Sequence, residues 1–378
     1  MKSILKKQGF VNALASILAI ICGLVFGLLI LIIANPSQAF AGLGYLIRGG
    51  FSGGMKGLGE VLYYATPIIM TGLAVGFAFK TGLFNIGATG QFLAGAFVAI
   101  YIGVEWTFLP GALHWIVAVI CGTLAGGVLG LVPGVFKAYL NVHEVISSIM
   151  MNYISLYGLN FAMKKTVIDN YTNQTQNVAE TAVIPSGFLD QIFSNPIANT
   201  RSTSSLTMSI FIAIGAALVR YVILNKTVFG YELKACGYNE HASKYAGISS
   251  KRNIVLSMAI SGMLAGMGGA LLFLCNSRGR HIEVIDALMS EGFNGIPVAL
   301  LGLNNPIGIV FAGIFVAHLT VAGSYMQALD YVPEIVDMII AVIIYCSAFG
   351  LVFRGVIVKL LTGTLFQNNR KSLEREGN

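Results

Sequence analysis

Long apolar runs separated by short polar segments make up most of the chain. A helix that crosses a bilayer needs about 20 mostly apolar residues, and ten segments have that character. They lie at residues 11–34, 60–79, 84–104, 112–136, 143–163, 206–225, 253–275, 284–301, 305–326 and 335–353. The pattern predicts an all-α integral membrane protein with about ten transmembrane helices, in a single transmembrane domain over residues 1–378.

The first apolar run has features of a cleaved signal peptide, because it follows three lysines and Ala39-Phe40-Ala41 lies just beyond it. The apolar part of a signal peptide is about 7 to 15 residues long. Here residues 13–34 carry no charge over 22 positions. The length favours a retained first helix.

The composition supports a membrane location. Hydrophobic residues make up 56% of the chain and charged residues 10%, whereas soluble domains carry about 25% charged residues. The net charge is +7, but the basic residues lie between apolar runs rather than on one face, so no nucleic-acid partner is expected. The five cysteines lack metal-ligand spacing and are interpreted as packing residues; no metal or cofactor is expected.

The basic residues also predict the orientation. With the N-terminus inside, 16 of the 23 Lys and Arg residues fall on the inner side, and cytoplasmic segments of membrane proteins carry the excess of such residues. Both termini are therefore expected in the cytoplasm, including the basic tail 354–378.

The longer outer connection, residues 164–205, is rich in Asn, Ser and Thr, with Asn195-Pro196 as a turn signal. It is either an external cap or a solvated linker.

The longer inner connection, residues 226–252, predicts a short exposed helix from Glu240 to Ala246. Asn239 is a favourable N-cap, Lys244 follows Glu240 at a spacing of four, and Gly247 is a favourable stop.

Two apolar stretches are interrupted by glycines and amides. They are Gly82-Leu-Phe-Asn-Ile-Gly-Ala-Thr-Gly-Gln91 and Gly292-Phe-Asn-Gly-Ile-Pro297. A broken or re-entrant helix exposes backbone polar groups, which a membrane tolerates only beside a cavity or buried protein. Asn85, Gln91 and Asn294 are therefore candidates for a polar solute path. The alternative is that these amides only hydrogen-bond between helices.

Two short sequences recur at nearly one offset. Gly122-Thr-Leu-Ala-Gly126 resembles Gly262-Met-Leu-Ala-Gly266, and Glu144-Val-Ile146 recurs as Glu283-Val-Ile285. An inverted internal repeat, common in transporters, explains both matches. Small-residue helix packing explains the first match equally well.

The chain lacks the motifs of an energy-converting enzyme. No G-x-x-x-x-G-K-[ST], H-E-x-x-H or G-x-S-x-G sequence occurs, so neither ATP binding by a phosphate-cradling loop nor hydrolase chemistry is expected. A gradient-driven carrier usually needs acids at the middle of its spans, and the span centres here are nearly free of them.

Four motifs resemble those of one family, the permease subunits of ATP-binding-cassette importers in the simple sugar and nucleoside branch. They are residues 82–91, Glu144-Val-Ile-Ser-Ser-Ile-Met-Met-Asn-Tyr153, the stretch from Gly230 through Glu240 to Ile248, and residues 292–302. Within that branch the chain looks most like the longer of two permeases in bacterial nucleoside uptake systems with a lipoprotein receptor of the basic membrane protein type. The family pattern often has Glu where Thr89 stands, so no role is carried over to this position.

The resemblance implies a nucleoside or simple-sugar permease domain in the bacterial plasma membrane that works by alternating access. Its implied partners are a cytoplasmic ATPase, a second and shorter permease in a heterodimer, and an external lipoprotein receptor. The loop 226–252 would be the coupling element. Its contact and capping residues would be Asn239, Glu240, His241, Lys244, Tyr245 and Gly247. A gradient-driven secondary nucleoside carrier remains the alternative function, and a non-transport scaffold subunit is a third.

Overall fold

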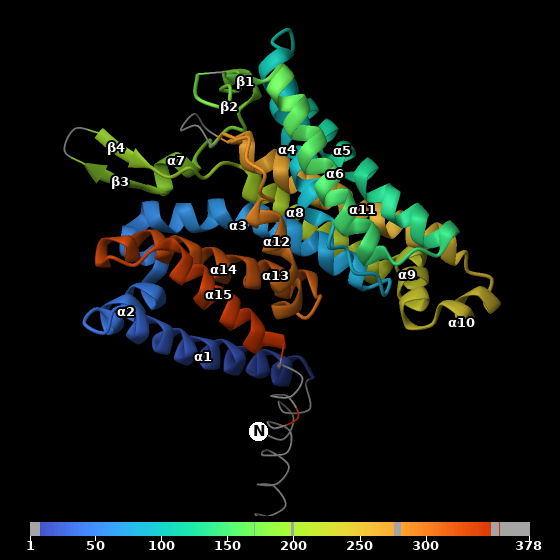
Figure 1. Ribbon diagram of the computed structural model, residues 1–378, viewed down its shortest axis with the longest axis horizontal. Helices are drawn as coiled ribbons and strands as arrows, with labels where there is room; N and C mark the ends of the chain where they lie inside the picture. Colours follow the sequence, from blue (N-terminus) through green and yellow to red (C-terminus); the bar gives the residue numbers. More distant parts are fainter. Residues whose placement is uncertain (1–7, 170, 198–199, 276–280, 349–354, 356–378) are drawn as a thin grey trace, which may run out of the picture. The chain divides into compact units, whose positions relative to one another are not determined.

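The computed structural model describes residues 8–169, 171–197, 200–275, 281–348 and 355 (Figure 1). The described chain is mostly helical and divides into two compact units, residues 1–47 with 323–378 and residues 48–322. The predicted basic tail, residues 354–378, lies outside the described residues apart from Gly355.

The smaller unit pairs the two ends of the chain. Its helices are α1 (Gln8–Ala34), most of α2 (Ala39–Arg48), the last turn of α14 (Pro306–Met326), η3 (Gln327–Leu329) and α15 (Pro333–Ala348). The hydroxyl of Tyr331, just before α15, donates to the carbonyls of Leu31 at 3.3 Å and Asn35 at 3.0 Å. Each of these carbonyls also accepts a backbone N–H, from Asn35 and Gln38 respectively, so the tyrosine adds a second bond to each at the end of α1.

The larger unit holds the remaining long helices. They are α3 (Gly54–Phe79), which follows the short η1 (Gly49–Gly53), α4 (Ala88–Glu105), α5 (Gly111–Leu140), α6 (Glu144–Thr166), α8 (Ser209–Lys226) and α11 (Ser250–Phe273). Shorter helices are α9 (Val228–Tyr238), α10 (Glu240–Tyr245), α12 (Ser290–Phe293) and α13 (Gly295–Leu301). Helix α11 packs against α3, α4 and α5, and α6 lies along α4 (Figure 1).

Within the described residues, six helical runs are long and apolar enough to cross a membrane. They are Ala39–Phe79, Ala88–Glu105, Gly111–Leu140, Ser209–Lys226, Ser250–Phe273 and Pro306–Leu329. A multi-pass membrane protein is therefore confirmed, whereas the predicted number of about ten spans is not. Helix α6 has the length of a span but is less apolar, because it buries Ser148, Asn152 and Asn160 against the protein.

The prediction of one span over residues 284–301 was wrong. Only the four residues of α12 and the seven of α13 are helical there, with a break at Asn294. The break falls in Gly292-Phe-Asn-Gly-Ile-Pro297, where an interruption was expected. Glycine and proline are the residues that disfavour a continuous helix most.

The two similar pentapeptides pack on each other where α5 crosses α11. A Cβ atom built on Gly266 would lie 2.7 Å from the carbonyl oxygen of Gly122, and Cβ atoms built on Gly126 and Gly262 would each lie 2.4 Å from the carbonyl oxygen of the other. Only glycine permits so close a backbone approach. Helix packing thus accounts for the first sequence recurrence, and the inverted repeat is not confirmed.

The connection 164–205 is a folded cap rather than a solvated linker. It contains the antiparallel pairs β1 (Ile168–Asp169) with β2 (Gln174–Thr175) and β3 (Ser194–Ile197) with β4 (Thr200–Thr203), and the short helices η2 (Glu180–Ala182) and α7 (Leu189–Ile192). The side chains of Val167 and Ile184 are fully buried. The predicted turn at Asn195-Pro196 was wrong, since both residues lie in β3. The Asn195 amide instead donates to the carbonyl of Gly53 at 2.8 Å, which ties the hairpin to the start of α3.

Candidate functional site

The predicted helix of the inner connection is confirmed as α10, which ends at Tyr245, one residue earlier than expected. The side-chain oxygen of Asn239 accepts from the backbone N–H of Ala242 at 3.0 Å. At the other end Gly247 has a φ of +81°, and the N–H of Ile248 bonds the carbonyl of Ser243 at 3.0 Å. Local capping at both ends therefore fixes the helix.

Helix α10 presents one charged and aromatic face to solvent. Asn239, Glu240, His241, Lys244 and Gly247 are exposed, and Tyr245 is 96% exposed. Ser243 is buried and anchors the opposite face. Sequence reasoning missed Tyr238, which ends α9 and is 90% exposed. Tyr238 and Tyr245 are both exposed, and tyrosine is one of the residues enriched in protein–protein interfaces.

The first interrupted motif folds into a closed hydrogen-bonded pair of amides. The Nδ2 of Asn85 donates to Oε1 of Gln91 and to Oγ of Ser261, both at 2.8 Å, and Nε2 of Gln91 donates back to Oδ1 of Asn85 at 3.3 Å. Asn85 is 0% and Gln91 1% exposed. In this conformation the two amides bond each other, so their role on a solute path stays a prediction that requires the pair to open.

Asn152, in the motif Glu144–Tyr153, connects α6 to the interrupted motif of residues 82–91. Its Oδ1 accepts from the backbone N–H of Gly90 at 2.9 Å, and its Nδ2 donates to the carbonyl of Ile86 at 3.0 Å. One α6 side chain thus satisfies two backbone groups that the break before α4 leaves unpaired. The sequence did not predict this role for Asn152, because its hydrogen-bond partners lie more than 60 positions away in the chain.

The interrupted motif of residues 292–297 packs against the start of α4, next to the first interrupted motif. A Cβ atom built on Gly292 would lie 2.5 Å from Cα of Thr89, so α12 touches the first turn of α4. The carbonyl of Glu291 accepts from the Thr71 hydroxyl at 3.3 Å. The Thr89 hydroxyl is buried and has no hydrogen-bond partner in the described part of the chain. Asn294 is half-buried at the start of α13, outside the Asn85–Gln91 pair.

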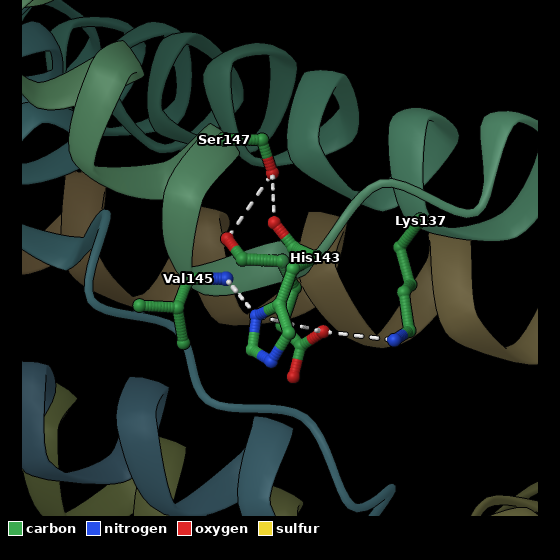
Figure 2. Close-up of polar contacts among 5 residues, drawn as sticks. Lys137, His143, Val145 and Ser147 are labelled. Carbon is green, nitrogen blue, oxygen red and sulfur yellow. Dashed lines mark hydrogen bonds and ion pairs between the residues drawn. The ribbon is translucent and has the colours of Figure 1, made fainter.

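A polar cluster fixes the start of α6 to the end of α5. Figure 2 shows Lys137 reaching the carboxylate of Glu144, at 3.0 Å between Nζ and Oε2. The backbone N–H of Val145 donates to Nδ1 of His143 at 3.3 Å, and the Ser147 hydroxyl donates to the carbonyl of Glu144 at 3.1 Å. These contacts fix the connection between α5 and α6, where the motif Glu144–Tyr153 begins.

Arg220 of α8 is a buried basic residue, although its sequence position predicts only one of the 16 basic residues of the inner side. It is 2% exposed, and its Nη2 donates to the carbonyl of Asn304, in the turn between α13 and α14, at 3.2 Å. Its Nε and Nη1 and the Oδ1 of Asn304 have no hydrogen-bond partner among the described residues. Lys80 directly follows α3 and lies near Arg220. The pKa of Lys80 is lowered, mainly because the side chain is partly buried and secondly because Arg220 and Lys234 are also positively charged.

Three separated motifs thus meet around buried polar groups in a helical membrane protein, and the capped helix α10 stands exposed. Broken helices that meet around buried polar groups are typical of a membrane transport subunit. The chain belongs to the permease family described as branched-chain amino acid transport system, permease component, whose model matches residues 57–348.

The chain is similar to permeases with named solutes. It is 40% identical to the guanosine ABC transporter permease protein NupP of Bacillus subtilis over 350 residues, covering 92% of this chain and 97% of that one. It is 34% identical to the nucleoside permease protein NupB of Lactococcus lactis over 92% of this chain and 94% of that one. NupQ, a second guanosine permease protein of B. subtilis, is 24% identical over 72% of this chain and 84% of its own length. No solved structure matches the chain.

Proposed function

We propose that the chain is the permease subunit of an ATP-binding-cassette importer that moves nucleosides into the cytoplasm by alternating access. The observation that carries the proposal is the 40% identity to a guanosine permease over nearly the full length of both chains. Since this chain lacks a phosphate-cradling loop, ATP is hydrolysed by partner subunits.

The exposed face of α10 is the contact with the cytoplasmic ATPase. Glu240, His241, Lys244 and Tyr245 enter a cleft of that partner, and Asn239 and Gly247 hold the helix ends. Support comes from the capping bonds and from the exposure of these side chains. Closure of the ATPases on ATP then displaces α9 and α11, which flank α10 in the chain.

The complete importer contains a second, related permease, an external solute-binding lipoprotein and the surrounding lipid of a bacterial plasma membrane. A heterodimer is supported by the similarity of this chain to both NupP and NupQ of one organism. The permease is one domain in which about ten segments cross the bilayer, some of them broken, with both termini in the cytoplasm.

The solute path runs past Asn85, Gln91 and Asn294. Amides both donate and accept hydrogen bonds, which suits a neutral nucleoside. The mutual bonds of Asn85 and Gln91 close the path in the present conformation, so passage of the solute requires their exchange for bonds to the nucleoside.

The test is uptake of labelled guanosine, uridine and ribose by cells with and without this gene, each with an active or a hydrolysis-dead cognate ATPase. We expect nucleoside uptake only where both the gene and the active ATPase are present. Uptake that needs this chain but survives the dead ATPase would identify the alternative, a gradient-driven nucleoside carrier.

A further inference from the structure

A cavity of about 460 Å³ lies in the larger unit between α4, α6, α11 and the segment 281–291. Solute pockets typically measure about 300 to 1,000 Å³, so its size fits a small organic solute. The cavity does not include the Asn85–Gln91 pair, and nothing in the sequence pointed to it as one site.

The lining combines an aromatic and aliphatic wall with hydrogen-bond acceptors. Phe273 and Leu156 contribute apolar surface, while Asn160, Glu283 and Glu291 contribute oxygens. The Nδ2 of Asn160 donates to the carbonyl of Ile285 at 3.0 Å, which leaves the amide oxygen as its acceptor. An aromatic face binds a planar base by stacking, and carboxylates accept hydrogen bonds from hydroxyl groups.

The segment 281–291 is held over the cavity by the folded cap. The backbone N–H of Thr175 in β2 donates to the carbonyl of Ile282, and the N–H of Ile282 donates to the Thr175 hydroxyl, both at 3.1 Å. The Gln174 amide donates to Oε1 of Glu283 at 2.9 Å. The position of an acceptor in the lining therefore depends on the cap.

The cavity floor adjoins the junction of the interrupted motifs. Leu93 lies one turn beyond Thr89 on α4, and Glu291 directly precedes Gly292. Thr89 and Gly292 are in close contact, and Thr89 belongs to the same segment as the Asn85–Gln91 pair. The Thr89 hydroxyl takes part in this contact, 2.8 Å from a Cβ atom built on Gly292, and is buried with no partner among the described residues.

We infer that this cavity is the chamber in which the permease holds a nucleoside, with the base on Phe273 and the ribose hydroxyls on Glu283, Glu291 and Asn160. Separation of Thr89 from Gly292 then opens the floor toward Asn85 and Gln91. The inference rests on the proposed function and adds to it a binding site and the requirement for free ribose hydroxyls.

The experiment measures binding of tritiated guanosine to the complete complex of both permeases and the ATPase in lipid nanodiscs, without the receptor. We expect guanosine to bind at least about tenfold more tightly than 2′,3′-dideoxyguanosine, since two hydroxyl donors are lost. Glu283→Gln with Glu291→Gln should reduce this preference to less than about threefold. Phe273→Leu should weaken guanosine binding about tenfold by removing the stacking face.

Matched substitutions outside the cavity serve as controls. Glu105→Gln and Phe108→Leu alter exposed residues near the end of α4 that do not line the cavity, and should leave both affinities unchanged. If Phe273→Leu fails to assemble, judged by size-exclusion elution and basal ATPase rate, the two glutamine substitutions carry the test.

The outcomes separate the two proposals. If cells take up guanosine through the wild-type complex, yet the complex does not bind it or the cavity variants bind it as the wild type does, the cavity assignment is overturned and the proposed function stands. If wild-type cells show no ATPase-dependent nucleoside uptake, the proposed function fails and the cavity assignment falls with it.

Discussion

Helices α11 and α8 both have the length and hydropathy of membrane spans, yet the larger unit holds them in opposite ways. Helix α11 touches α5 backbone to backbone through glycines such as Gly266. Helix α8 leaves open space around Gly215, exposes Leu218, and is tied to the α13–α14 turn by Arg220. The contrast distinguishes a frame packed backbone to backbone from a helix with one exposed face, and α10 lies in the chain between the two.

The largest loss of stability is expected from a larger side chain at Gly266, where α11 and α5 are in backbone contact. Gly266→Leu places a side chain against the backbone of Gly122 and Gly126, and overpacking that only backbone movement can relieve should destabilise the fold by more than about 3 kcal/mol. Fluorescence-detected size exclusion should show loss of the folded protein. Gly158→Leu on α6, where no atom lies within 4 Å of a Cβ, is the matched control. Equal tolerance of both substitutions would contradict the rigid frame.

The next effect is on coupling rather than folding. Glu240→Arg with Tyr245→Ala should abolish uptake and receptor-stimulated ATPase activity while leaving the membrane level unchanged, since both side chains are exposed. Quantitative blotting and ATPase assays measure the two quantities. Glu105→Arg with Tyr171→Ala changes the same residue types at exposed positions away from α10. Normal transport by the first pair would remove α10 from the mechanism.

Arg220→Met should separate stability from activity. Two guanidinium nitrogens are buried without partners among the described residues, and each such group costs about 1 to 3 kcal/mol, so an apolar side chain should raise the Tm by a few degrees. Uptake should fall about tenfold because the α13–α14 turn loses its bond to α8. Lys226→Met, at the exposed end of α8, should change neither quantity. Unchanged uptake by Arg220→Met would show that α8 does not act through this turn.

The smallest effect sharpens the contrast between the helices. Gly215→Ala in α8 meets no atom within 4 Å and should stabilise the protein by about 0.5 to 1 kcal/mol, because alanine favours the helix. The same change at Gly266 should lower the Tm. A thermal-shift assay on both variants compares the signs; a loss of stability at Gly215 would mean that α8 is packed as tightly as α11.

Local signals were enough for some features. The cap residues Asn239 and Gly247 predicted α10 to within one residue, because their bonds join near neighbours in the chain. Glycine and proline in residues 292–297 predicted an interruption, although the apolar run around them also suggested a span that does not form. The Asn195-Pro196 dipeptide predicts a turn and fails here. The bond from Asn195 to Gly53 joins segments far apart in the chain, which local sequence does not reveal.

The candidate site was predicted only in part for the same reason. Asn85 and Gln91 stood out as amides in an apolar run, but their mutual bonding depends on how the chain closes around Ser261. Asn152 and Arg220 bond partners more than 60 positions away, and no periodicity or spacing marks such pairs. The transport class came from the motif resemblance, which the family match confirms.

The capped ends of α10 have a consequence for assembly. A six-residue helix is too short to persist alone in water, yet here two caps and the buried Ser243 hold it in shape before any partner arrives. Ordering a loose segment upon association would cost about 1 to 2 kcal/mol per residue. A preorganised helix avoids that entropy loss, so under the proposed function a small contact area with the ATPase is enough for binding.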